Sequence, residues 1–447
     1  MLNTASLSLD QAPPISIPFR FFITAPLFGL AAGLLLLIYG PSLLLTRWSP
    51  MTLGLTHLIT LGMLAMVMCG ALLQMLPVLA GSPVPAVVPV GKTCHLFITA
   101  GTGLLVFSFI TGGDSANLFG LISLAVGIGL FFFAIAVALL RVKQVTHTVT
   151  AMRLALVAFL ITLMFGLLLG SGVLGAIGFG HIAPLVDVHL GWGLLGWIGL
   201  LLVGISYQVV PMFQVTPEYP MQIRRYLAPA IFLALLIWSV LMLGVIFNWF
   251  SAIVPRLWML LILPGYMLYA VVTLRLQRQR KRRVPDITML FWRNGMISIL
   301  LGVAIWIAGN VSETIANSPQ YHLLLGVCLV VGAGLSLVNG MLYKIVPFLS
   351  WFHLQNRQLS LMCMTVQVPN MKEFISDKAA RLQFNCYFLS LLFLFAAVIK
   401  PAWFAHLAGL LFLISNLLLF KNLAMAMSRF RATSQALDEY MIDSKAE

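Results

Sequence analysis

Three histidines in apolar segments are the residues of this chain best suited to hold a haem or a metal. His57, His189 and His322 each lie upstream of two glycines and a proline. The glycines of every copy are eight residues apart and the proline follows seven later: Gly62, Gly70 and Pro77; Gly196, Gly204 and Pro211; Gly332, Gly340 and Pro347. Neutral imidazole binds haem iron and copper well, and histidine in a membrane span is usually functional. The pattern predicts three matched helices, each with an imidazole near one end.

Further candidate ligands lie close to His189 or in another apolar segment. Asp187 could accept the second imidazole proton of His189 and so orient its ring, as carboxylates often do behind a metal-bound histidine. His181 and His189 are the candidate ligands for a metal such as copper, and His406 lies in the last apolar segment. Each of these histidines could instead be a hydrogen-bonding residue at a helix end. The five cysteines form no CxxC pair and indicate neither a disulfide framework nor a zinc site.

The elements that must position these histidines are membrane helices. The chain has 447 residues, of which 61% are hydrophobic and 9% charged, more apolar surface than a soluble domain can bury. The formal charge of +14 comes from basic residues in short loops between apolar runs, a pattern that fits topology and anionic lipid headgroups and not nucleic acid. The composition predicts an all-α polytopic membrane protein in contact with the lipid bilayer.

About twelve segments are long enough to cross the hydrocarbon core. They fall near residues 20–46, 51–79, 92–112, 117–141, 152–176, 184–212, 226–249, 253–276, 288–310, 321–349, 383–400 and 402–424. This predicts a tail over 1–19, a twelve-helix transmembrane domain over 20–424 and a second tail over 425–447. Basic residues gather in alternate loops, as in the run from Arg275 to Arg283, whereas loops such as 111–117 and 310–320 carry none. The positive-inside rule then predicts that both termini are cytoplasmic and that the three repeat histidines lie near extracytoplasmic helix ends.

The three repeats fall on the second, sixth and tenth spans, four spans apart. This interval predicts a pseudo-threefold arrangement of three four-helix bundles, with a site where the repeats meet. Glycines at this interval could also serve helix packing alone, because they let a neighbouring helix approach closely. Gln74, Gln208 and Lys344 stand three residues before the repeat prolines, either as part of a polar path or as side chains that reach the interface.

These motifs resemble those of a known group of proteins. GISYQVVP (204–211) and GMLYKIVP (340–347) are similar to helices six and ten of the catalytic subunit of haem–copper oxidases and nitric-oxide reductases. His57 with Gly62, Gly70, Pro77 and Gly81 resembles a motif of the NnrS family more closely, and FRFFITAPLFGLAAGLL (19–35) is similar to its first span. The resemblance implies a twelve-helix, haem–copper-oxidase-like protein of the bacterial inner membrane, linked to nitric-oxide metabolism.

The chain departs from the oxidase pattern at the catalytic ligands. The seventh span carries no histidine, the expected His-x-His of the tenth span reads Leu325, Gly326 and Val327, and His189 is two residues from the expected copper ligand. We therefore expect one haem, of b type, held by His57 with either His322 or His189, with copper as an open possibility.

The expected role is nitric-oxide response or respiratory redox metabolism, with a redox partner or a respiratory-complex subunit. Two alternatives remain: a cofactor-free assembly or transport protein on the same fold, and an active terminal oxidase or nitric-oxide reductase.

Overall fold

The computed structural model describes residues 13–172, 179–281, 286–363 and 365–446. Over this part of the chain it has twelve helices long and apolar enough to cross a membrane, which confirms the predicted all-α polytopic class. Nine of the twelve contain no π-helical segment: α1 (Ser16–Tyr39, continued by the 3₁₀ segment η2, Gly40–Leu44), α4 (Val87–Thr111), α5 (Asp114–Leu140), α6 (His147–Gly170), α9 (Met221–Ile246), α10 (Ile253–Arg278), α11 (Ile287–Val311), α16 (Asp377–Ile399) and α17 (Pro401–Ala446). The short helices α12 (Glu313–Ala316) and α15 (Met371–Phe374) lie in loops.

The other three membrane helices are the ones that carry the repeat. They are composites: α2 (Pro50–Ile59), η3 (Thr60–Ala65) and α3 (Met66–Ala80); α7 (Phe179–Gly191), η5 (Trp192–Gly199) and α8 (Leu200–Gln214); α13 (Pro319–Gly326), η6 (Val327–Leu335) and α14 (Ser336–Ser360). Their most apolar windows are 83, 56 and 72% buried, against 28–50% for the other nine spans. The repeat helices are therefore the inner helices of the bundle.

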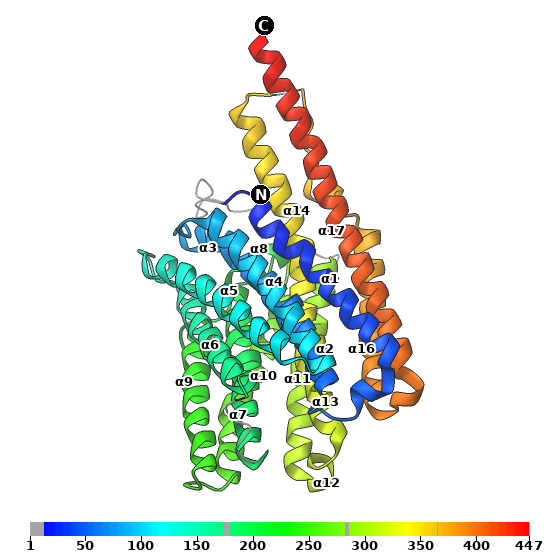
Figure 1. The fold of residues 1–447 in the computed structure, drawn as a ribbon. Helices are drawn as coiled ribbons and strands as arrows, with labels where there is room; N and C mark the ends of the chain where they lie inside the picture. The colour runs from blue at the N-terminus through cyan, green and yellow to red at the C-terminus, as the bar shows by residue number, and fades with distance from the viewer. Residues whose placement is uncertain (1–12, 173–178, 282–285, 364, 447) are drawn as a thin grey trace.

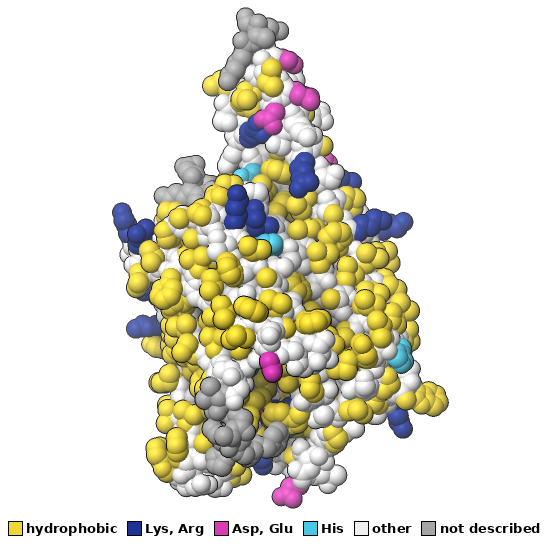
Figure 2. Space-filling model, viewed as in Figure 1, with side chains coloured by type: hydrophobic (Ala, Val, Ile, Leu, Met, Phe, Trp, Pro, Cys, Tyr) yellow, Lys and Arg dark blue, Asp and Glu magenta, His cyan; other side chains and the backbone are white. Residues whose placement is uncertain are grey.

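The two ends of the chain lie on one side of the bundle, which we call the terminal face, and α12 lies on the opposite face (Figure 1). Apolar side chains cover most of the visible body of the molecule, while many Lys and Arg side chains sit near the base of the projecting helices (Figure 2). Such a surface fits contact with a lipid bilayer.

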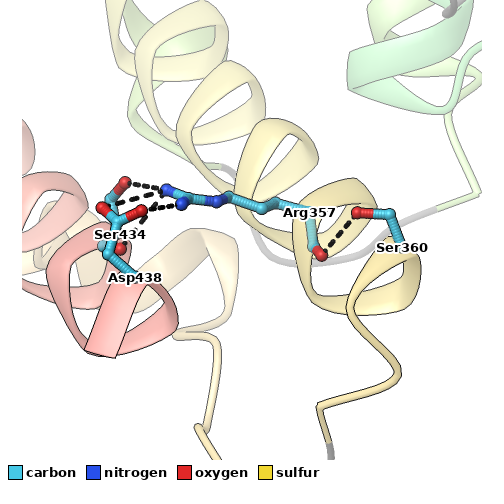
Figure 3. A network of polar contacts seen from close by, with 4 residues as sticks. All are labelled: Arg357, Ser360, Ser434 and Asp438. Atoms are coloured by element: carbon cyan, nitrogen blue, oxygen red, sulfur yellow. Dashed lines mark hydrogen bonds and ion pairs between the residues drawn. The ribbon is translucent and has the colours of Figure 1, made fainter. Parts of the chain in front are cut away.

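Helices α14 and α17 continue well beyond the predicted ends of their spans, residues 349 and 424. The apolar run stops there, but helix formation does not require apolar residues once another helix supplies contacts. Arg357 of α14 forms an ion pair with Asp438 of α17, and its Nη1 donates to Ser434 Oγ at 2.7 Å (Figure 3). The two extensions thus support each other as they project from the terminal face.

The repeated glycines pack each inner helix against the first helix of its own group of four. A Cβ added at any of the six would come within 2.4–2.8 Å of a neighbouring side chain. The neighbours are Phe28 and Phe21 of α1, Ala158 and Ala151 of α6, and Ser298 and Phe291 of α11, for the first and second glycine of each copy. The two neighbours of each copy are seven residues apart, and the neighbour of the second glycine comes earlier in the chain than the neighbour of the first. Each inner helix is therefore antiparallel to the helix that it packs against. The glycines do serve helix packing, and they do so identically in three places.

Each inner helix is also interrupted by a π-helical segment at its first repeat glycine: Gly62 in η3, Gly196 in η5 and Gly332 in η6. A π segment widens the helix and disturbs the usual i→i−4 hydrogen bonds, and such segments are frequent at functional sites. Segment η6 contacts both η3 and η5. The three interruptions therefore lie at the centre of the bundle.

Tyrosine hydroxyls from outer helices satisfy carbonyl groups in two of these segments. Tyr266 of α10 donates to the Leu195 carbonyl in η5, and Tyr387 of α16 donates to the Val331 carbonyl in η6. Each of these carbonyls belongs to the residue directly before the repeat glycine. Because both tyrosines are buried, their hydroxyls hold the widened turns in place.

The Tyr266→Phe variant should lower the free energy of unfolding by about 1–3 kcal/mol, because the Leu195 carbonyl would lose its buried donor. Thermal unfolding of the full chain in detergent measures this. Tyr226→Phe is the matched control, since the Tyr226 side chain is exposed on α9. Equal unfolding temperatures for the two variants would show that the hydroxyl does not support η5.

Candidate functional site

A cavity of about 1160 Å³ lies between the inner helices and reaches toward the opposite face. Its walls include His57, His189 and His322, together with apolar side chains from η3, η5 and η6. The three π segments and the repeat histidines thus line the same cavity. His57 and His189 each lie three residues before a π segment, and His322 lies five residues before one.

The structure brings His57 and His189 together. Their ring centroids are 6.4 Å apart and the ring planes differ by 24°. Both side chains are partly accessible, as expected for residues that line a cavity. We call these two residues the imidazole pair.

Backbone carbonyls fix the tautomer of both rings. His57 Nδ1 lies 2.8 Å from the Leu53 carbonyl oxygen, and His189 Nδ1 lies 3.0 Å from the Thr162 carbonyl oxygen. A carbonyl can only accept, so Nδ1 carries the proton in each ring and Nε2 of the neutral ring keeps its lone pair. A backbone carbonyl on the other nitrogen is a common support for a metal-bound histidine.

This arrangement corrects the expectation for Asp187. Its carboxylate does not orient His189, whose Nδ1 is held by Thr162 of α6. Asp187 Oδ1 instead accepts from Arg47 Nη1 at 2.8 Å. One turn of α7 separates residues by three or four positions, so Asp187, two residues before His189, points elsewhere.

Among the described side chains, neither His322 nor His406 has a ring contact with the imidazole pair. His322 lines the same cavity, but its described ring contact is with Tyr321, at 5.0 Å between centroids. His406 packs over Gly40, and its Nδ1 donates to the Leu37 carbonyl oxygen at 2.8 Å, which is a helix-end role. The side chain of His181 lies outside the described residues.

Within the described residues, no group of three or more His, Cys, Asp and Glu side chains is arranged to hold a metal ion. The predicted copper site at His181 and His189 stays a prediction. What the described residues offer is a pair of imidazoles beside a large cavity, each with Nδ1 held by a backbone carbonyl, and such imidazoles can bind a metal or haem iron through Nε2.

Sequence reasoning missed the charged residues at the mouth of the cavity. Arg47 follows η2 and Arg256 lies in the first turn of α10, and both line the cavity. Among the described residues, the Lys and Arg side chains near the opposite face are those of Arg47, Arg256 and Lys400. The loops on that face were predicted to be poor in Lys and Arg. Their departure from the charge rule is the signal that would have singled them out.

The fold and the site together define a polytopic membrane protein with a histidine-lined internal cavity. No protein-family model matches the chain, and no curated protein matches it. Its similarity to NnrS proteins and haem–copper oxidases therefore stays a prediction that rests on the motifs.

Proposed function

We propose that the chain is a haem-binding protein of the bacterial inner membrane, with both termini in the cytoplasm, and that His57 and His189 are the axial ligands of a b-type haem. The observation that carries the proposal is the imidazole pair: two rings, with Nδ1 held by backbone carbonyls and centroids 6.4 Å apart, beside a cavity of about 1160 Å³. Of the two pairings that the sequence left open, this geometry favours His189 over His322.

The cavity supports the proposal by its size and lining. Small-molecule pockets commonly have volumes of about 300–1,000 Å³ and are largely apolar. This cavity is somewhat larger than that range and is lined by aliphatic and aromatic side chains such as Leu124, Phe159 and Trp197. A flat macrocycle with an apolar body is the kind of ligand that such a space accepts. Bound haem would supply one-electron redox chemistry.

The chain's own residues would bind and orient the haem and exclude water from it. The Leu53 and Thr162 carbonyls would keep each imidazole from rotating and raise its basicity. A role in nitric-oxide response or respiratory redox metabolism, with electrons from a partner protein, follows from the motif resemblance.

The direct test is the absorption spectrum of the full chain purified from haem-supplied cells, oxidised and then reduced with dithionite. We expect a Soret band and the sharp visible bands of a six-coordinate low-spin haem. Folded protein without a Soret band would contradict the proposal and favour the cofactor-free alternative.

A further inference from the structure

Two arginines stand at the mouth of the cavity that holds the imidazole pair. Arg47 comes from the loop after η2 and Arg256 from the first turn of α10. They approach from different helices, and both line the same space as His322 and Tyr321. A membrane protein whose opposite face carries few basic residues thus concentrates two of them at one opening.

The Arg47 guanidinium is held in place but keeps hydrogen-bonding capacity. Its Nη1 donates to Asp187 Oδ1 at 2.8 Å, and its Cζ lies 4.3 Å from the centre of the Trp48 ring. The side chain is only 18% exposed, and its Nε is buried without a hydrogen-bond partner. A buried guanidinium N–H without an acceptor is costly, so a ligand oxygen at this position would be favourable.

Arg256 has no acidic partner among the described residues. Its side chain is exposed at the mouth, on the side of the cavity where Tyr321 lies. Because Asp187 balances Arg47, the charge of Arg256 is left uncompensated. The mouth therefore carries a net positive charge that would attract an anion.

A ligand that fits both parts of this cavity has a flat apolar body and acidic groups at one edge. Haem has this form, with two carboxylates on one side of the ring, and arginine binds carboxylates through paired, charge-assisted N–H donors. We propose that Arg256 and Arg47 bind the two haem carboxylates at the mouth, which fixes the edge of the ring that faces outward. This inference rests on the proposed function.

The test compares haem with its dimethyl ester, which keeps the iron and the ring but has no carboxylates. Both porphyrins are titrated into the purified full chain, and binding is followed at the Soret band. We expect wild-type protein to bind haem at least about tenfold more tightly than the ester, as the loss of charge-assisted hydrogen bonds predicts.

In the Arg256→Gln variant, haem affinity should fall by about tenfold while affinity for the ester stays unchanged. Arg256→Lys should recover part of the haem affinity. Lys400→Gln is the matched control, because Lys400 lies near the same face but outside the cavity wall. Its haem affinity should equal that of the wild type.

Equal affinity of wild-type protein for haem and ester, or an Arg256→Gln effect that is the same for both, would overturn the carboxylate assignment. The haem proposal would survive either result, because the iron ligands are not involved. If the wild type binds neither porphyrin, the proposed function fails and this inference with it.

Discussion

The His189→Ala variant is expected to lose the low-spin spectrum of the wild type and to bind haem more than about 100-fold less tightly. Loss of a group that only supports a metal ligand costs about 10–100-fold in affinity, and loss of the ligand itself should cost more. Removing His189 leaves one imidazole on the iron, so the visible bands should broaden to those of a five-coordinate, high-spin haem. His57→Ala should give the same change.

Two matched histidine variants make this result specific. His406→Ala removes an imidazole that caps a helix end outside the cavity, and it should leave the spectrum and the affinity unchanged. His322→Ala removes a ring that lines the cavity but lies outside the imidazole pair. If His322→Ala abolishes the low-spin spectrum and His189→Ala does not, the other pairing allowed by the sequence is the right one.

The Gly204→Val variant should destabilise the fold by about 3 kcal/mol, at the upper end of the cost of overpacking. A Cβ at this position would lie 2.4 Å from the Ala151 Cβ of α6, closer than two carbon atoms can approach. Neither helix can yield easily, because the same contact recurs eight residues earlier, between Gly196 and Ala158. Thermal unfolding in detergent, followed by circular dichroism, measures the loss.

Gly103→Val is the matched control for this contact. It introduces the same side chain into a membrane helix, and a Cβ there would have no neighbour within 4 Å. Its unfolding temperature should stay close to that of the wild type. If Gly204→Val is as stable as this control, the glycine repeat does not set the distance between the inner helices and their neighbours.

The sequence predicted the membrane fold well because length and hydropathy directly reflect the cost of placing polar backbone in lipid. All twelve predicted spans correspond to helices in the structure. The predicted helix ends were wrong where hydropathy carries no information about helix length. The extension of α14 to Ser360 depends on tertiary contacts such as Arg357 with Asp438 and not on apolar composition.

The site was predicted in part for a similar reason. A histidine in an apolar run is conspicuous, so His57 and His189 were identified, but their proximity depends on how α2 and α7 pack. The partner of His189 was missed because the Thr162 carbonyl belongs to the backbone of another helix, and any residue type carries a carbonyl. The π segments were missed because the repeated glycines explain close packing equally well without them.

The most direct test of the central claim, that His57 and His189 bind one iron from opposite sides, is the low-temperature electron paramagnetic resonance spectrum of the oxidised protein. The ring planes differ by 24°, and nearly parallel axial imidazoles give a rhombic low-spin signal. We predict that signal in the wild type and its loss in both His57→Ala and His189→Ala. A high-spin signal in wild-type protein, or a rhombic signal that persists in either variant, would contradict the assignment.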